Sequence, residues 1–234
     1  MSPISRNLQA VRERIDAAAR AALRDPQDVH LLAVSKTFGA DAVLEAAAAG
    51  QCAFGENYLQ EALDKIAAVR EAQPGLLLEW HFIGPIQSNK TRPIAENFDW
   101  VHSVERDKIA RRLSEQRPAH LPPLNVCLQV NISGEASKSG VAPEEVAALA
   151  REVAAMPNLK LRGLMAIPEP EEDIERQRAP LRRMRELFVS LQAQGLALDT
   201  LSMGMSSDLE AAVAEGATIV RIGTAIFGQR HYAN

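Results

Sequence analysis

Short runs of β-branched and other apolar residues alternate along the chain with longer stretches rich in Ala, Leu and Glu. The short runs predict buried strands and the longer stretches predict helices. Strands are predicted at Val29–Lys36, Cys52–Gly55, Trp80–Gly84, Trp100–Val104, Asn125–Ile132, Leu161–Ile167, Leu201–Met203 and Ile219–Gly223. Helices are predicted between them, near residues 40–49, 57–71, 89–97, 105–117, 143–156, 174–194 and 207–215.

One more helix is predicted ahead of the first strand, at Ile4–Leu23, because Leu8, Val11 and Ile15 recur at helical spacing. Strands that alternate with helices indicate a parallel sheet of the α/β class, and eight such units favour a closed (β/α)8 TIM barrel. Few residues follow the last strand, so the extra N-terminal helix is predicted to cover the barrel there. An open doubly wound sheet is the alternative, but no glycine-rich phosphate loop follows the first strand.

Composition and charge narrow the class of protein. No linker divides the 234 residues, and the hydrophobic fraction of 47% is enough for one large core, so residues 1–234 are predicted to form a single domain. A net charge of −4, without a clustered basic face, argues against nucleic acid as a partner. No uncharged apolar stretch approaches the roughly 18 residues that a membrane span needs, so no membrane association is predicted.

The cysteines and the N-terminus bear on the compartment. Cys52 and Cys127 lie in predicted strands, so both are expected to be buried free thiols, which suit a reducing compartment. The first residues carry no secretory signal, so a cytoplasmic location is expected. No spacing typical of a metal site is present, and none is predicted.

Lys36 is the first candidate for chemistry, because the functional face of such a barrel lies at the C-terminal ends of its strands. Leu32, Val34 and Lys36 share one side of the first strand. If that side faces the interior, desolvation can lower the pKa of the lysine by up to ~3–5 units and leave a neutral amine able to attack a carbonyl. The alternative is a lysine that leaves the strand end for solvent.

The loops after the last two strands form the second candidate, because barrels often hold phosphate there. Ser206 and Ser207 follow the seventh strand, and Ser207 with Glu210 predicts a capping box at the start of the next helix. Such a helix N-terminus suits a phosphate, although by itself it is only a capped helix. Gly223 and Thr224 follow the eighth strand, and they offer close backbone approach and a hydroxyl.

Arg221 lies inside the eighth strand, on the same side as Gly223, and is predicted to point into the barrel. A buried arginine needs a partner. A structural carboxylate is one alternative. The other is the ring nitrogen of a cofactor, which would have to accept a hydrogen bond because arginine keeps its proton.

Several longer motifs occur in a specific order, namely AVSK around Lys36, FGENY at 54–58, WHFIG at 80–84, SMGMSSD at 202–208 and RIGTAIFG at 221–228. The chain thereby resembles the pyridoxal phosphate homeostasis protein family, from near the N-terminus to Gly228. The barrel of this family is similar to the N-terminal domain of alanine racemase. The resemblance implies the same fold for this chain.

The resemblance also implies roles for single residues. Lys36 would hold pyridoxal 5′-phosphate (PLP) as a Schiff base, Arg221 would face the pyridine nitrogen, and Asn57 would lie beside the cofactor. Phosphate contacts are implied for Ser206, Gly223 and Thr224, with Ser207 as a further neighbour. The loop Ser133–Gly140 resembles a family motif and could place Lys138 at the rim of the pocket. His81 is expected to be a histidine with satisfied hydrogen bonds rather than a general base.

The resemblance implies a role in PLP (vitamin B6) and amino-acid homeostasis. The expected function is that of a non-catalytic protein that binds PLP reversibly and passes it to PLP-dependent apoenzymes. No catalytic residue is predicted, because racemisation needs a base on each face of the substrate carbon and only Lys36 is a candidate. Alanine racemase completes its site with a tyrosine from a second domain. This chain has no residues for such a domain, which makes a monomer plausible. The alternatives are a small PLP-dependent amino-acid racemase and a Schiff-base aldolase that needs no cofactor.

Overall fold

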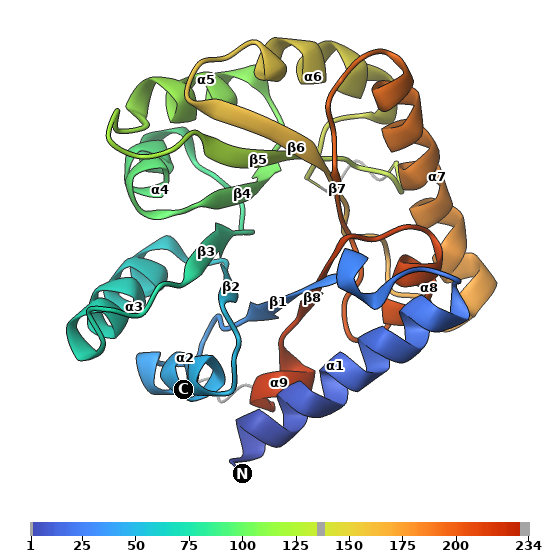
Figure 1. The fold of residues 1–234 in the computed structure, drawn as a ribbon. Helices are drawn as coiled ribbons and strands as arrows, with labels where there is room; N and C mark the ends of the chain where they lie inside the picture. The colour runs from blue at the N-terminus through green and yellow to red at the C-terminus, as the bar shows by residue number, and fades with distance from the viewer. Residues whose placement is uncertain (1, 135–138, 230–234) are drawn as a thin grey trace.

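The computed structural model of the protein describes residues 2–134 and 139–229. Eight parallel strands form a closed barrel in the order β1 to β8, each paired with its neighbours in sequence, and helices surround it (Figure 1). The predicted (β/α)8 barrel is therefore confirmed. The strands are β1 His30–Val34, β2 Ala53–Glu56, β3 Glu79–Phe82, β4 Trp100–Val104, β5 Leu124–Gln129, β6 Leu159–Met165, β7 Thr200–Ser202 and β8 Ile219–Ile222.

In the part of the chain that the structure describes, the outer layer consists of α-helices and three short 3-10 turns. The α-helices are α1 Pro3–Ala21, α2 Ala40–Ala48, α3 Leu59–Ala72, α4 Thr91–Asn97, α5 Asp107–Gln116, α6 Val146–Ala154, α7 Ile174–Ala193, α8 Leu209–Ala214 and α9 Thr224–Phe227. The 3-10 turns are η1 Pro26–Asp28, η2 Ser88–Lys90 and η3 Pro143–Glu145. The short α9 follows β8 directly and was not predicted.

Helix α1 covers the barrel where β8 returns to β1, as the sequence predicted. The two strands pair in parallel from His30 opposite Ile219 to Ala33 opposite Ile222. Helix α1 packs against α8 and α9 outside this junction (Figure 1). Its stripe of Leu8, Val11 and Ile15 is buried, as its helical spacing requires.

The barrel has an outer core between strands and helices and an inner core along its axis. The inner core contains Leu32 and Val34 of β1, Ile83 just after β3, Trp100 of β4, Cys127 of β5, Met165 of β6 and Ile219 of β8. Polar side chains are buried along the axis as well, among them His81, His102, Ser202 and Arg221. Side chains alternate between the two faces of a strand, so one face of each strand fills the outer core and the other meets the axis.

Some local expectations are corrected by the structure. Cys127 is a buried free thiol in β5, as predicted, but Cys52 is exposed. The reason is that β2 begins only at Ala53, so Cys52 lies just before the strand. Likewise β1 ends at Val34, and Lys36 lies just beyond it. Within residues 2–134 and 139–229, no helix is long and apolar enough to cross a membrane.

Candidate functional site

A pocket of about 260 Å³ opens at the C-terminal ends of the strands. It is bordered by the segments that follow β1, β2 and β7, and by the end of β8. The structure brings all seven predicted cofactor-binding residues together in its lining: Lys36, Asn57, Ser206, Ser207, Arg221, Gly223 and Thr224. Apolar walls come from Val34, Ile83, Ile167 and Met205. A small concave site with a few converging polar groups is typical of a cofactor site.

Lys36 is half-buried two residues after β1, in a backbone segment with unusual geometry. The next residue, Thr37, has a φ of 69°. The left-handed region is unfavourable for a β-branched residue, at a cost of roughly 1–2 kcal/mol. Strain of this kind persists where the surroundings hold it, and it is common at functional sites.

The segment around Lys36 is held in place from helix α3. The carboxylate of Glu61 accepts a hydrogen bond from the backbone N–H of Thr37 at 2.6 Å. The ammonium of Lys65 donates to the backbone carbonyl of Ser35 at 2.8 Å. The residues on both sides of Lys36 are therefore fixed by side chains of one helix.

Lys65 belongs to a buried polar cluster that was not predicted from the sequence. Its ammonium lies 2.6 Å from Glu56 Oε1 and 3.0 Å from Glu61 Oε1. The hydroxyl of Ser35 also donates to Glu56, at 2.6 Å. Burial raises the pKa of Glu56, and the nearby Lys65 opposes that shift. One signal was available: Lys65 lies in the buried stripe of α3 with Ala62, so a cation occupies a core position there.

Asn57 follows β2 and reaches the pocket with an unused acceptor. Its side-chain Oδ1 is buried and has no hydrogen-bond partner among the described residues. Buried polar atoms are normally paired, so an orphan in a pocket fits a ligand that brings the missing donor. The backbone of Asn57 is pressed against Gly84, where an added Cβ would lie 2.2 Å from the Asn57 carbonyl oxygen. This contact explains why a glycine ends the WHFIG motif.

Arg221 of β8 is buried, and its guanidinium reaches the pocket from the barrel interior. It donates to Ser202 Oγ at 2.7 Å and to the carbonyl of Ala166 at 2.8 Å. These two bonds use two of its five N–H donors. Among the residues that the structure describes, no carboxylate lies within ion-pair distance of Arg221, and its partners there are a hydroxyl and a backbone carbonyl. Burial lowers the pKa of Arg221 to about 10, so the group stays charged at neutral pH and a nitrogen facing it must act as acceptor.

The loop after β7 differs from its prediction. Helix α8 begins at Leu209 with Asp208 in the capping position, and Ser207 makes no capping bond. Asp208 instead accepts the backbone N–H of Met205 at 2.6 Å. Glu210, expected to complete the capping box, pairs with Arg14 of α1 at 2.6 Å. The capping box is therefore wrong, because Asp208 closes the turn and Arg14 attracts the glutamate.

The two predicted phosphate loops still face the same pocket. Ser206 is half-buried in its lining, whereas Ser207 and Thr224 are exposed at its edge. Gly223 lies against β1, where an added Cβ would approach the Val34 carbonyl oxygen to 3.1 Å. With a short α8, the expected anion contacts would come from the loop backbone and hydroxyls.

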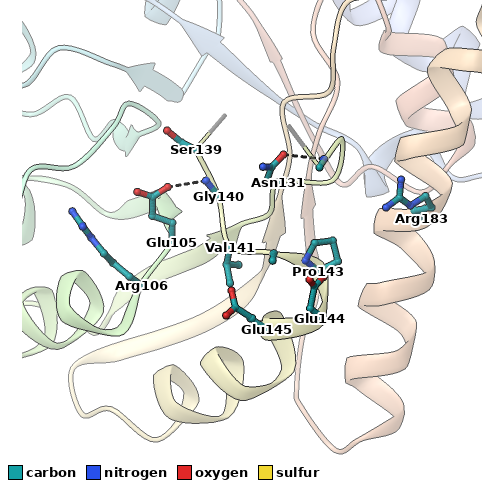
Figure 2. Close-up of a pocket in the computed structure, with 12 residues that line it drawn as sticks. Glu105, Arg106, Asn131, Ser139, Gly140, Val141, Pro143, Glu144, Glu145 and Arg183 are labelled. Carbon is teal, nitrogen blue, oxygen red and sulfur yellow. Dashed lines mark hydrogen bonds between the residues drawn. The ribbon is translucent and has the colours of Figure 1, made fainter. Parts of the chain in front are cut away.

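A second pocket of about 330 Å³ adjoins the first and shares Asn57, Ile83 and Ile167 with it. A larger hollow of about 720 Å³ lies beyond, with Glu105 as a common lining residue (Figure 2). There Glu105 accepts the backbone N–H of Gly140 at 2.7 Å. None of the seven predicted residues lines this hollow. Lys138 of the predicted rim loop lies outside the described residues.

His81 and His102 are buried on the barrel axis rather than in the pocket. Each has hydrogen-bond partners on both ring nitrogens, as expected for His81. The carboxylate partner of His81 is Glu79, two residues earlier on the same strand. Among the described residues no group of three His, Cys, Asp or Glu side chains could hold a metal ion.

The fold and the site define a class of protein, namely a (β/α)8 barrel with a lysine in the pocket at its C-terminal mouth. Comparison with known proteins agrees with this class. Residues 6–231 match the model of the alanine racemase N-terminal domain family. The chain is 66% identical to the pyridoxal phosphate homeostasis protein of Pseudomonas aeruginosa over 232 residues, which cover 99% of this chain and 98% of that one. The protein of that name from Escherichia coli strain K12 is 55% identical over 234 residues, 100% of this chain and 99% of that one. The chain belongs to the pyridoxal phosphate homeostasis protein family, as its motifs predicted.

A solved structure adds a comparison with a ligand. PipY of Synechococcus elongatus PCC7942, solved with PLP bound, is 38% identical to this chain and superposes with a TM-score of 0.83. The match covers 96% of this chain and 100% of PipY.

Proposed function

We propose that this protein binds PLP as a Schiff base on Lys36 and acts without catalysis in intracellular PLP and amino-acid homeostasis. The observation that carries the proposal is the convergence of Lys36, Arg221 and the two phosphate loops on one pocket of about 260 Å³. Membership of the family and the PLP-bound structure of PipY support it. PLP would supply a reactive aldehyde group. The protein would limit the reactions of this group while PLP is bound.

Each part of the pocket has a defined task in this proposal. Lys36 supplies the amine, and the Glu61 and Lys65 contacts hold the backbone that carries it. The charged guanidinium of Arg221 would donate to the pyridine nitrogen, which would then stay unprotonated. Asn57 Oδ1 offers an acceptor beside the ring. The loops that carry Ser206, Ser207, Gly223 and Thr224 would hold the phosphate.

The residues that line the pocket favour reversible binding of PLP over catalysis on an amino acid. Of its described lining residues, only Lys36 and Arg221 carry titratable side chains. Racemisation needs a second base opposite the lysine, and the adjoining Glu105 is engaged by the backbone of Gly140. A ring nitrogen without a proton is also a poor electron sink, which disfavours carbanion chemistry. Reversible binding by a cytoplasmic, monomeric protein would let PLP pass to apoenzymes.

An absorption spectrum with PLP tests the proposal. We expect a Schiff-base band in the violet that disappears on borohydride reduction and is absent from Lys36→Ala. Lys160→Ala, which removes an exposed lysine from β6, is the matched control and should keep the band. A wild-type protein that forms no band with PLP would refute Schiff-base binding. Exchange of the α-proton of an amino acid for deuterium, well above the rate with free PLP, would refute the non-catalytic role.

A further inference from the structure

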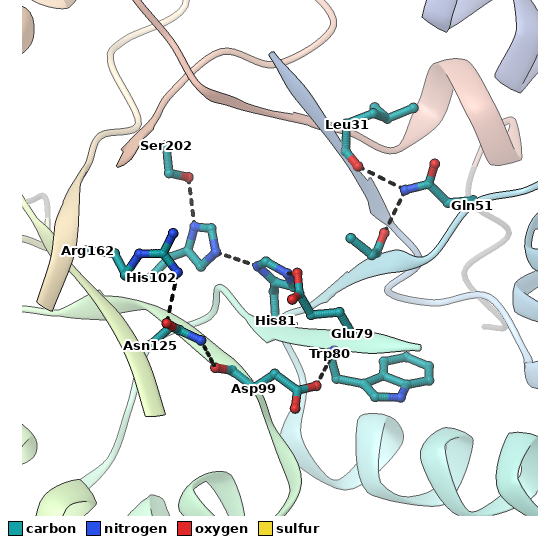
Figure 3. A network of polar contacts seen from close by, with 11 residues as sticks. Leu31, Gln51, Glu79, Trp80, His81, Asp99, His102, Asn125, Arg162 and Ser202 are labelled. Carbon is teal, nitrogen blue, oxygen red and sulfur yellow. Dashed lines mark hydrogen bonds and ion pairs between the residues drawn. The ribbon is translucent and has the colours of Figure 1, made fainter. Parts of the chain in front are cut away.

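A chain of hydrogen bonds runs along the barrel axis from the PLP pocket towards the opposite mouth. Arg221 donates to Ser202 Oγ at 2.7 Å, and Ser202 Oγ lies 2.7 Å from His102 Nδ1. His102 Nε2 is 2.8 Å from His81 Nδ1, and His81 Nε2 is 2.7 Å from the carboxylate of Glu79 (Figure 3). We call these five residues the axial chain.

Its far end is open to solvent at the N-terminal ends of the strands. Glu79 is half-exposed and begins β3. It lines a cleft of about 580 Å³ together with Asp28, Arg162 and other residues, and no residue of this cleft lines the PLP pocket. The axial chain thus links two surfaces that share no lining residue.

The Glu79 end of the axial chain fixes the direction of every bond in it while both rings are neutral. A carboxylate can only accept, so His81 carries its single proton on Nε2 and donates to Glu79. His81 Nδ1 must then accept, so His102 carries its proton on Nε2 and donates to it. His102 Nδ1 in turn accepts the hydroxyl proton of Ser202, whose oxygen accepts from Arg221. The opposite direction would set an unprotonated His81 Nε2 against that carboxylate.

The surroundings keep both rings neutral and in place. Burial lowers the pKa of His81 and lowers that of His102 further, so neither ring takes a second proton at neutral pH. The indole of Trp100 stacks on His81, with ring centroids 5.2 Å apart and planes 7° from parallel. The guanidinium of Arg162 lies 4.5 Å from the centroid of the Trp100 ring. Neutral rings with one proton each satisfy the axial chain without a buried charge between its ends.

We propose that Ser202, His102, His81 and Glu79 are positioning residues, which hold the Arg221 guanidinium towards the pyridine nitrogen through one-directional hydrogen bonds anchored on Glu79. The effect on PLP rests on the proposed function, whereas the direction of the bonds is a property of the protein alone. The half-exposed Glu79 at one mouth thereby sets the geometry of the cofactor contact at the other mouth.

The direction of the bonds can be measured without PLP. We expect the ¹⁵N spectrum of histidine-labelled protein at neutral pH to show both His81 and His102 neutral with the proton on Nε2. Signals from the Nδ1–H form, or from a doubly protonated ring, would overturn the proposal. In Glu79→Gln the amide oxygen still accepts from His81, so both signals should stay as in the wild type.

The effect on the cofactor is measured with matched variants. Glu79→Ala and Ser202→Ala should weaken PLP binding by about 2- to 10-fold, as expected for one lost hydrogen bond in a buried chain, and should shift the Schiff-base band. Glu79→Gln should keep the affinity for PLP within about 2-fold of the wild type and should leave the Schiff-base band in place. Asp28→Ala, in the same cleft but outside the axial chain, should match the wild type.

The possible failures have different meanings. If Glu79→Ala and Asp28→Ala bind PLP equally well with the same band, the axial chain does not position Arg221 and the inference is wrong. If the wild type forms no band, the proposed function fails, while the ¹⁵N spectrum still decides the direction of the bonds.

Discussion

The ammonium of Lys65 donates a hydrogen bond to the backbone carbonyl of Ser35, 2.8 Å away and one residue before Lys36. The same ammonium pairs with Glu56 of β2 at 2.6 Å. One buried cation therefore joins the end of β1, the end of β2 and helix α3 beneath Lys36. Charge in the core serves here to fix the backbone that carries Lys36.

Replacing Lys65 by methionine should destabilise the protein strongly. The substitution leaves Glu56 buried without its cation, and loss of one partner of a buried pair costs about 3–5 kcal/mol. Urea denaturation should show this as a lower midpoint with little change in slope. PLP binding should weaken as well, because the Ser35 carbonyl loses its donor.

The double variant Lys65→Met/Glu56→Gln is the control for that explanation. With both charges gone, no uncompensated charge remains, and a large part of the lost free energy of unfolding should return. If the double variant is as unstable as Lys65→Met alone, lost packing rather than the unpaired charge is the cause.

Substitution of Gly84 by alanine should disturb Asn57. The new methyl group would lie 2.2 Å from the Asn57 carbonyl oxygen, so backbone must move, at a cost of about 1–3 kcal/mol for overpacking. Asn57 lines the pocket proposed to hold PLP, so affinity for PLP should fall as well. Gly75→Ala, where an added Cβ meets nothing within 4 Å, should leave stability within about 0.5 kcal/mol. Equal effects of the two substitutions would contradict the contact.

Acid should destabilise the protein through the two buried histidines. Burial lowers the pKa of His81 and His102 in the folded state, whereas both titrate near ~6.5 when unfolded. Below about pH 6.5 the unfolded chain binds protons that the folded chain does not, so the free energy of unfolding falls by up to ~1.4 kcal/mol per pH unit for each histidine. Above that pH both forms are neutral and this contribution is constant.

Urea denaturation at several pH values between 5 and 8 measures how steeply the free energy of unfolding changes with pH, which is called the pH slope below. His102→Asn should reduce the pH slope below pH 6.5, whatever its effect on stability at pH 8. His120→Asn removes an exposed histidine and serves as the control, with the pH slope of the wild type expected. An unchanged pH slope in His102→Asn would show that this ring does not resist protonation.

The two thiols should differ widely in reactivity. Cys52 is exposed, whereas Cys127 is buried and burial raises its pKa to about 12. Because the thiolate is the reactive form, a disulfide reagent at pH 8 should label one thiol rapidly and the other only as fast as the protein unfolds. Cys52→Ser should remove the rapid phase. Two rapid thiols in the folded protein would contradict the burial of Cys127.

The alternation of apolar runs and helical stretches was enough to predict the barrel, because each βα unit repeats the same local pattern. The predicted span of β4, Trp100–Val104, matches the structure at both ends. Lys36 and Arg221 were found because a charged residue in or beside an apolar strand is conspicuous. The motif resemblance added Asn57, which has no such signal of its own.

Features made by residues far apart in the sequence were not predicted. The pairing of Glu210 with Arg14 joins residues 196 positions apart, and no local pattern reveals that it competes with a capping box. The axial chain combines side chains from four strands, β3, β4, β7 and β8. The alternation within a strand indicates that His81 and His102 face one side, but only barrel closure decides which neighbours they meet.

The pairing of β1 with β8 has a consequence for how the protein is made. Leu32 meets Arg221 across this pair, so strand β1 leaves the ribosome long before its second partner exists. Until then one edge of β1 and the apolar stripe of α1 are uncovered, and both can associate with other chains. Contacts of such long range also slow folding. A nascent chain that stalls before Ile219 is therefore the form of this protein that most needs a chaperone.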